Sequence, residues 1–455
     1  MADIFSFHGY RYNPSRVNLQ RVLTHPYDKI TPAMQQKYYD ADPHNLIAIE
    51  KGCALPGDSP QNNVYTRAAE ALDNWIAGGV LVREPAPSFY VYEQEFALPQ
   101  TPERHVRRGL ITLARIEDYS AGIVFRHEQT LAAPKADRLE LLRHTRAHTG
   151  QLFMLYSDGE RNIDSLLEEV VSAPPVMDVA DELGVNHRLW PVSESARVAR
   201  IRTLLGDKTL VIADGHHRYE TALTYRNECR ARLGTVDRDA AHEKVMITLV
   251  NTRSEGLIIL PTHRVISNLR DFSADKLLQK LKPYFKSELR PFHDNQERAA
   301  TYAIFRDVLA SQSAKKTLPN TRRIGLYAGL DQSSNVPKGF FVLELFPDAD
   351  LAKLLPEISA AQRELDVVLL HRFILEKCLG ITEQAVTAEK NVTYEREMET
   401  AVSAVDSGAA QLCFLLNPVD VEQVVKIAIA GEVMPQKSTD FYPKLLSGVT
   451  IYRLE

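Results

Sequence analysis

The sequence is poor in cysteine and tryptophan. Of its 455 residues, only four are cysteine and two are tryptophan. The cysteines lie far apart, and none has the close partner of a zinc or redox motif. Such usage indicates reduced, mostly packed thiols in a cytosolic protein and argues against a disulfide framework. The four residues are Cys53, Cys229, Cys378 and Cys413.

The sequence also lacks a long apolar run and an excess of positive charge. No segment approaches the roughly 18 consecutive apolar residues of a membrane span. The first residues have neither the basic region nor the apolar run of a signal peptide. With 54 basic and 59 acidic residues, the net charge is -5, whereas a broad nucleic-acid surface requires concentrated basic charge. We therefore expect a cytoplasmic protein without a membrane partner, and nucleic acid is disfavoured as a partner.

The remaining composition is that of a globular protein, with 44% hydrophobic and 25% charged residues. Apolar periodicity predicts a helix over 62–77 and a buried strand over 209–213 that runs into a helix over 216–232. We predict an α/β fold (α+β, with a mixed sheet) in three interlocked lobes. The middle lobe carries the most informative motif, and whether it completes one core with the first lobe stays open. The lobes are residues 1–160, 161–345 and 346–455.

That motif is Asp214-Gly215-His216-His217-Arg218, at the junction of the predicted strand and helix. Backbone N–H groups at a helix start point outward and carry the positive end of the helix dipole, so phosphate binds there readily. Gly215 allows a close approach, and Arg218 offers guanidinium donors. Taken singly, Asp214 is most simply a helix cap and each histidine a packed side chain. Two adjacent histidines followed by arginine favour a binding site.

A second polar group precedes this motif. His127 and Glu128 follow Arg126, while Lys135 and Arg138 lie at the predicted start of a helix. Imidazole, carboxylate and cationic groups together suit acid–base catalysis and anion binding. The same spacing suits a solvated helix with i,i+3 and i,i+4 ion pairs, and the sequence does not separate the two interpretations.

Further candidates are scattered along the chain. Asp28, in a His-Pro-Tyr-Asp turn, and Glu50 are candidate general bases, although most such carboxylates are simply solvated. His263, Lys437 and Ser438 are candidates for substrate binding. The alternatives are a packed or capping histidine and an ordered loop that closes the domain.

His216 and His217 do not show the spacing of a metal site. Neighbouring positions on a helix point about 100° apart, so these two side chains do not easily share one ion. We expect no resident metal, whereas Mg²⁺ brought in with a nucleotide needs only one or two carboxylates.

Taken together, these segments resemble a bacterial family called "domain of unknown function 1015". The resemblance extends in order over nearly the full chain, and the family name implies no activity. The segments that carry it are His25-Pro26-Tyr27-Asp28, Arg126-His127-Glu128-Gln129-Thr130 with Pro134-Lys135 and Asp137-Arg138, residues 213–220, and residues 434–439 with 441–444.

The segment 214–220 is also similar to the phosphate-binding loop of the ParB/sulfiredoxin superfamily, and within it to free-serine kinases, which phosphorylate L-serine. The resemblance implies a ParB/sulfiredoxin-like nucleotide-binding core that takes ATP or ADP with Mg²⁺. It places residues 214–218 at the phosphates and an acidic base near the N-terminus. Asp28 and Glu50 are the candidates for that base. The residues expected to complete the site are His127, Glu128, Lys135 and Arg138.

We therefore expect an ATP- or ADP-dependent phosphotransferase for a small hydroxylated metabolite, with free L-serine as one candidate. The second hypothesis is a phosphate-ester or nucleotide hydrolase in which the His-rich loops activate water. The third is a non-catalytic nucleotide-binding regulator of ParB-like type. The acceptor, the nucleotide donor and the formation of a homodimer stay open.

Overall fold

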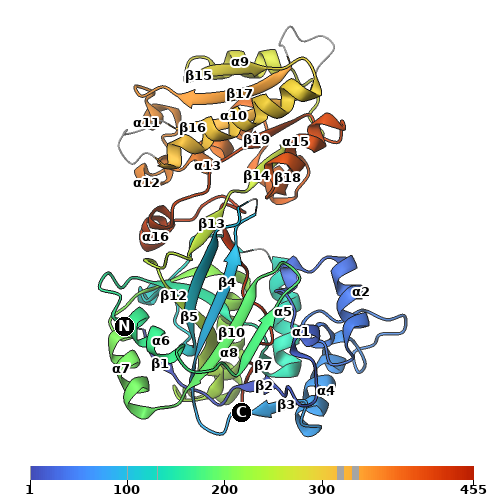
Figure 1. Cartoon of the computed structure of the whole chain (residues 1–455), viewed down its shortest axis with the longest axis vertical. Helices are drawn as coiled ribbons and strands as arrows, with labels where there is room; N and C mark the ends of the chain where they lie inside the picture. The colour runs from blue at the N-terminus through green and yellow to red at the C-terminus, as the bar shows by residue number, and fades with distance from the viewer. Residues whose placement is uncertain (1, 100, 131, 315–321, 330–337) are drawn as a thin grey trace. The chain divides into compact units, whose positions relative to one another are not determined.

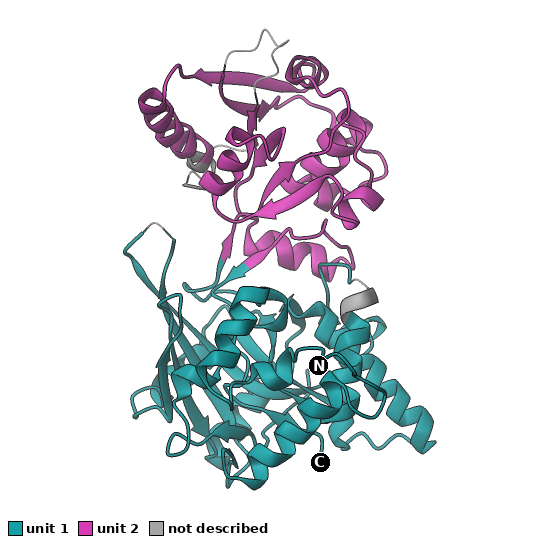
Figure 2. Ribbon diagram, turned by 90° about the vertical axis from the view of Figure 1, so that its right-hand side faces the viewer, with its two compact units in different colours: residues 1–258, 441–455 teal, residues 259–440 magenta. Residues whose placement is uncertain are grey.

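The chain folds into two compact units, defined by its backbone contacts (Figure 2). Unit 1 comprises residues 1–258 and 441–455, and unit 2 comprises residues 259–440. The C-terminal segment therefore belongs to the same unit as the N-terminus. In this computed structural model the described residues are 2–99, 101–130, 132–314, 322–329 and 338–455.

These limits differ from the three lobes expected above, because strands pair across the expected boundaries. Strand β10 (Asn186–Val192) pairs with β4 (Phe89–Ala97), across the expected boundary at 160. Strand β19 (Leu412–Leu415) pairs with β16 (Arg323–Ala328), across the expected boundary at 345. Backbone hydrogen bonds thus join residues that local patterns assign to separate lobes.

Unit 1 contains a nine-stranded mixed sheet in the order β6-β11-β8-β12-β5-β4-β10-β9, with β1 paired to β5. The pairs β6–β11 and β8–β12 are parallel, and the others are antiparallel. This mixed sheet, with the helices around it, confirms the predicted α/β class. Besides β4 and β10, its strands are β1 (Ile4–Phe5), β5 (Arg104–Arg115), β6 (Val124–Phe125), β8 (Leu152–Tyr156), β9 (Met177–Ala180), β11 (Leu210–Asp214) and β12 (Lys244–Asn251).

Three helices share a hydrophobic core with one set of alternating strand residues. They are α6 (Asn162–Val170), α7 (Ser195–Leu205) and α8 (His216–Leu233). Helix α5 (Ala132–Thr145) packs on α8 and on α4 (Val64–Ala77). The shorter elements of this unit are β2 (Tyr10–Tyr12), α1 (Leu19–Val22), η1 (Tyr27–Lys29), α2 (Pro32–Ala41), α3 (Ile47–Glu50), β3 (Leu81–Arg83), η2 (Tyr119–Ala121), β7 (Ala147–His148), η3 (Ala241–Glu243) and β21 (Tyr452–Arg453).

Residues 441–447 are here called the C-terminal segment. They pack against side chains of the same sheet that do not belong to the hydrophobic core described above. Gln94 of β4 and Arg107 of β5 lie opposite each other in the strand pairing, and both contact this segment. Further on, β21 pairs with β7, so the red end of the chain in Figure 1 runs among the blue and green elements of unit 1. This return of the chain positions the site described below.

Unit 2 contains a six-stranded sheet in the order β15-β17-β16-β19-β14-β18. Its core packs α10 (Asn295–Ala314) and α15 (Met398–Asp406) on this sheet. Besides β16 and β19, its strands are β14 (His263–Ile266), β15 (Phe285–Pro291), β17 (Gly339–Leu345) and β18 (Val392–Glu395). Its other helices include α9 (Ala274–Leu281), α11 (Leu351–Leu354), α12 (Ala360–Arg363), α13 (Asp366–Val368), a π-helical turn η4 (Leu369–Cys378), α14 (Glu383–Thr387) and α16 (Val421–Ile429).

Two predictions about composition can be compared with this fold. Cys229, Cys378 and Cys413 are buried and Cys53 is exposed, and all four are free thiols, as expected. Across the described residues, none of the helices is both long enough and apolar enough to span a membrane.

The close contact of β5 with β12 generates a stability prediction. A Cβ atom on Gly109 would lie 2.7 Å from Thr248 Cγ2 and 3.1 Å from the Leu249 carbonyl oxygen. Gly109→Ala should therefore destabilise the protein by about 1–3 kcal/mol through overpacking. Thermal denaturation measures the change, with Gly159→Ala as the control, because a Cβ atom at Gly159 meets nothing within 4 Å. Equal midpoints for the two variants would contradict the prediction.

Candidate functional site

The strand–turn–helix junction predicted from the sequence is present in unit 1. Strand β11 ends at Asp214, Gly215 adopts a left-handed conformation with φ of 97°, and α8 begins at His216. A Cβ atom on Gly215 would lie 2.8 Å from Leu152 Cδ2. Both the positive φ and this close approach require glycine. The sharp turn directs the first N–H groups of an 18-residue helix toward the end of the strand.

Asp214 is the centre of a closed ring of polar contacts, here called the Asp214 ring. Its carboxylate accepts from the Lys444 ammonium at 3.2 Å and from the Arg218 guanidinium at 3.3 Å. Arg218 also donates to the backbone carbonyl of Gln151 at 2.8 Å. The Gln151 side-chain amide donates to the carbonyl of Leu446 at 3.1 Å, which returns the ring to the C-terminal segment.

Positive charge dominates around this carboxylate. Burial raises the pKa of Asp214, but Lys444, Arg218 and Lys29 together outweigh burial and hold the pKa well below its ordinary value. Three cations therefore surround one carboxylate. Because Asp214 stays ionised, it cancels only part of the positive charge at the start of α8.

The His-Pro-Tyr-Asp turn adjoins this ring through Tyr27. Arg138 lies over the Tyr27 ring, 4.3 Å from its centroid. Burial raises the pKa of the Tyr27 hydroxyl to about 12, with Asp28 and Glu50 acting in the same direction and Arg218 and Arg138 opposing it. Tyr27 thus lies within electrostatic range of two predicted bases and two predicted phosphate-binding arginines.

The two candidate bases occupy different environments. Glu50 is 3% exposed, accepts a hydrogen bond from the Thr149 hydroxyl and lies 3.8 Å from the Arg138 guanidinium. Arg138 also donates to the Glu50 backbone carbonyl at 2.7 Å and to the Asp137 carboxylate at 2.7 Å. Asp28, by contrast, is exposed. Glu50 is therefore part of a buried ion pair, and Asp28 is open to a ligand.

Glu220 organises the other cations of the site. Its carboxylate accepts from Lys135 at 2.8 Å, from Arg126 at 3.0 Å and from the Thr130 hydroxyl at 2.6 Å. Burial raises the pKa of Glu220, and the bonds from Lys135 and Thr130 and the charge of Arg126 lower it further than burial raises it. One carboxylate in the second turn of α8 thus holds the segment that enters α5.

His127 and His216 form a buried pair. Their rings meet edge to face with centroids 4.7 Å apart, and the His127 backbone N–H donates to His216 Nε2 at 3.4 Å. Burial lowers the pKa of His127 to about 3 and that of His216 to about 4, so both rings are neutral at pH 7. Glu128 and His217 lie near this pair and are half-buried.

The three candidate substrate-binding residues belong to unit 2. His263 is 1% exposed, and its Nδ1 accepts from the Leu416 backbone N–H at 3.2 Å. Burial, reinforced by Arg264, lowers the pKa of His263 to about 3. Lys437 is exposed, and Ser438 is buried and donates to the Pro435 carbonyl. His263 and Ser438 are therefore bonded to backbone groups of unit 2, and their role in substrate binding stays a prediction.

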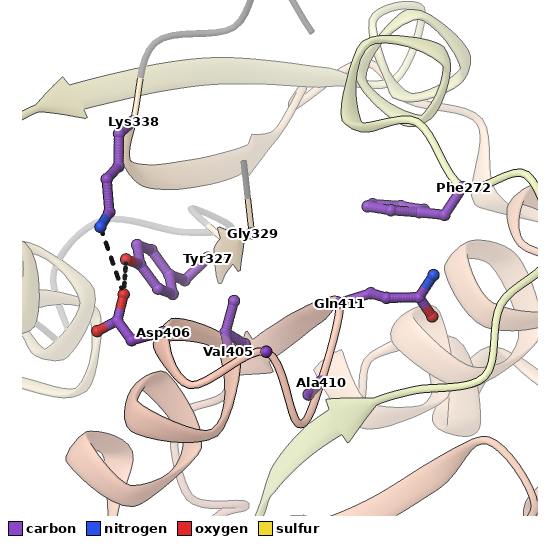
Figure 3. Close-up of a pocket in the computed structure, with 9 residues that line it drawn as sticks. Phe272, Tyr327, Gly329, Lys338, Val405, Asp406, Ala410 and Gln411 are labelled. Atoms are coloured by element: carbon purple, nitrogen blue, oxygen red, sulfur yellow. Dashed lines mark hydrogen bonds and ion pairs between the residues drawn. The ribbon is translucent and has the colours of Figure 1, made fainter. Parts of the chain in front are cut away.

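Unit 2 also contains a cavity of about 530 Å³ that no sequence motif indicated (Figure 3). At one end Asp406 accepts from the Tyr327 hydroxyl at 2.5 Å and lies 3.6 Å from the Lys338 ammonium. Phe272 faces across it, and the Gln411 amide is bonded to the backbone of Leu269. The polar side chains of Asp406, Tyr327 and Gln411 thus have hydrogen-bond partners within unit 2.

Within the part of the chain that the structure describes, no group of three or more His, Cys, Asp and Glu side chains is arranged to hold a metal ion. The carboxylates of the site have cationic partners instead: Asp214 has Lys444, Glu50 has Arg138, and Glu220 has Lys135.

Three residues of the site were not among the sequence candidates for it: Tyr27, Gln151 and Glu220. Tyr27 and Glu220 lie inside the family motifs, and that membership was the available signal. Gln151 bonds through both its backbone and its side chain, and no local pattern marks such a residue.

The buried histidine pair generates a pH prediction. In the unfolded chain a histidine has a pKa near 6.5, above the folded values of about 3 and about 4. Protonation therefore favours unfolding, and the stability that neutral burial provides is complete above pH 6.5 and decreases toward the folded pKa values. From pH 7 to pH 5, each histidine should reduce the free energy of unfolding by roughly 2 kcal/mol.

His216→Gln should flatten this dependence. Thermal denaturation of the wild type and the variant between pH 5 and pH 7 measures it, and the two curves should converge as the pH falls. His293→Gln is the control, because the His293 side chain is 86% exposed. Parallel curves for the wild type and His216→Gln would exclude a buried neutral His216.

Comparison with curated proteins gives no match. Among solved structures, the chain is similar to a conserved hypothetical protein from Pyrococcus furiosus, with 13% identity and a TM-score of 0.31 over 71% of this chain and 90% of that one. It is also similar to a free serine kinase variant in complex with ADP, with 11% identity and a TM-score of 0.35 over 79% of this chain and 96% of that one. A third is SbnI with a C-terminal truncation from Staphylococcus aureus, with 10% identity and a TM-score of 0.31 over 74% and 85%.

TM-scores below 0.5 and identities this low do not establish a shared activity. The sequence shows a family relationship over most of the chain. One family model extends from the first strand of unit 1 into unit 2. That model, described as "Protein of unknown function (DUF1015)", matches residues 4–368, and the chain belongs to this family.

Proposed function

We propose that unit 1 is an ATP- or ADP-dependent phosphotransferase that acts on a small hydroxylated metabolite, with free L-serine as the first candidate. The observation that carries the proposal is the cluster of cations at the start of α8. Lys444, Arg218 and Lys29 act on the single carboxylate of Asp214, beside the positive end of an 18-residue helix. A polyphosphate is the biological ligand that such a site suits best.

The surroundings of Gly215 support close contact with a phosphate. As a glycine, Gly215 has no side chain that would shield its backbone from a ligand. Arg218 follows in the first turn of the helix. Arg218 is held at two points, by Asp214 and by the Gln151 carbonyl, so its guanidinium is oriented before a ligand arrives. Lys135 and Arg138 are engaged with Glu220 and with Glu50 and Asp137. In this proposal the N–H groups at the start of α8 and the Arg218 guanidinium bind the phosphates, Asp214 holds Arg218, and His216 and His217 contribute hydrogen-bonding groups.

Asp28 is the base that the environments favour. It is exposed, whereas Glu50 is buried with Arg138 and Thr149. In the reaction the acceptor oxygen forms a bond to the terminal phosphorus, and the bond between that phosphorus and the nucleotide oxygen breaks. The hydroxyl proton passes to the Asp28 carboxylate. Arg218 and the helix start stabilise the negative charge on the transferred group.

Mg²⁺ would accompany the nucleotide in this scheme. Asp214, Glu50 and Glu220 are engaged by cations, and within the described residues none of the His, Cys, Asp and Glu side chains forms a metal-binding cluster. The residues therefore fit a nucleotide better than a resident ion. A magnesium ion that is held mainly by substrate phosphates needs few protein ligands.

Removal of Arg218 tests the phosphate site. Arg218→Ala should weaken ADP binding by about 10- to 100-fold, since a charge-assisted hydrogen bond contributes roughly 1.5–3 kcal/mol. Isothermal titration calorimetry measures the affinity. Arg232→Ala is the matched control, because Arg232 is an exposed arginine in the last turn of the same helix. Unchanged affinity in Arg218→Ala would overturn the proposed site.

Substitutions of the two candidate bases, Asp28 and Glu50, should have different effects on turnover and on melting temperature. Asp28→Asn should lower the turnover of ATP or ADP with serine by about 100-fold or more, with little change in melting temperature, because Asp28 is exposed. Glu50→Gln should lower the melting temperature, because it removes one of the two carboxylates that compensate the buried charge of Arg138. Mass spectrometry of the products with a pool of hydroxylated metabolites identifies the acceptor.

The same assay separates the alternatives. Inorganic phosphate without any phosphorylated acceptor would indicate the hydrolase. Nucleotide binding without any product would indicate the non-catalytic regulator.

A further inference from the structure

The C-terminal segment is held on unit 1 by an unusual set of buried polar contacts. Arg107, which is 1% exposed, donates to the carbonyl of Tyr442 at 3.1 Å and to the carbonyl of Pro443. The Gln94 side chain donates to the carbonyl of Lys444 at 2.9 Å and accepts from Arg107 at 3.1 Å. Three successive carbonyls are thus fixed by two buried side chains.

Arg107 has neutral hydrogen-bond acceptors only. Its bonds go to an amide and two carbonyls, and its guanidinium lies over the Phe153 ring at 4.8 Å. Burial lowers the pKa of Arg107 to about 10, and the charge of Asp214 acts in the opposite direction. Burying a cation without a bonded carboxylate is unfavourable. Hydrophobic packing alone does not explain why the fold retains it beneath this segment.

The segment is also fixed at its other end. The Leu446 N–H donates to the Tyr92 hydroxyl at 3.4 Å, and the Leu446 carbonyl accepts from Gln151 at 3.1 Å. The Ser447 N–H donates to the Thr24 carbonyl at 2.8 Å, next to the His-Pro-Tyr-Asp turn. Lys444 lies between these two sets of contacts, and its side chain is 9% exposed. The backbone on both sides of Lys444 is therefore fixed while its ammonium contacts Asp214.

We propose that Lys444 is a positioning residue of the phosphate site: it holds the Asp214 carboxylate and, through Asp214, the guanidinium of Arg218 in the orientation that receives a phosphate. The inference rests on the proposed function. It also extends the site beyond residue 368, where the match to the family model ends. The packing at Gly150 supports it, because a Cβ atom there would lie 3.2 Å from the Arg218 guanidinium and 2.8 Å from Ser447 Oγ. The absence of a side chain at Gly150 thus leaves the space in which the Arg218 guanidinium lies close to the C-terminal segment.

A double-mutant cycle tests the inference on the full-length protein, with ADP as the probe. Lys444→Met should weaken ADP binding about 10-fold at 25 °C, and Lys444→Arg, which keeps a cation, should restore most of the affinity. If Lys444 acts through Asp214, then adding Lys444→Met to Asp214→Asn should change the affinity by less than about twofold. Lys208→Met is the control, because Lys208 is a lysine of the same unit whose partner Asp207 is 71% exposed.

Each outcome distinguishes the inference from the proposed function. No ADP binding by the wild type would overturn the proposed function and this inference with it. Binding by the wild type and equal binding by Lys444→Met would overturn the inference alone. A 10-fold loss that persists in the Asp214→Asn background would show that Lys444 contacts the nucleotide directly, and would also overturn the positioning role. A lower melting temperature of Lys444→Met without a change in affinity would reduce the residue to a structural one.

Discussion

The architecture of the site depends on one electrostatic arrangement, the Asp214 carboxylate between Arg218 and Lys444. A partly buried carboxylate is unstable without compensating charge. Arg218 supplies it from the helix that follows directly in the sequence, but Lys444 comes from 230 positions away. The contact therefore requires the end of the chain to return to unit 1. Two features hold the returning end of the chain on unit 1. Buried Arg107 donates to the Tyr442 carbonyl, and β21 pairs with β7.

This requirement explains why unit 1 is discontinuous. Residues 259–440 form a unit with its own sheet and its own core, inserted between the body of unit 1 and the C-terminal segment. Unit 1 is complete only after unit 2 has been synthesised, since Lys444 follows it. A truncation within unit 2 would thus remove the contact of Lys444 with Asp214 as well as part of a second fold.

Local features of the site were predictable from the sequence, and long-range ones were not. The helices predicted over 62–77 and 216–232 are confirmed as α4 and α8, because their apolar spacing and their glycine boundaries are local signals. The turn at Gly215 was predictable for the same reason. The contact of Lys444 with Asp214 has no local signature, and neither has the bond from Lys135 to Glu220. His263 illustrates another limit of prediction from sequence. A histidine next to a strand looks the same in sequence whether its ring is buried or exposed.

The same arrangement also limits what Asp214 can do. A carboxylate whose pKa is held low by Lys444 and Arg218 accepts a proton poorly, so it is a weak base despite its central place. His127 and His216 are neutral at pH 7, but burial disfavours the charged form that a base must pass through. Glu50 is engaged with Arg138. In the proposed reaction, proton transfer therefore falls to another group, and Asp28, which is exposed and lies beside Tyr27, is our candidate for it.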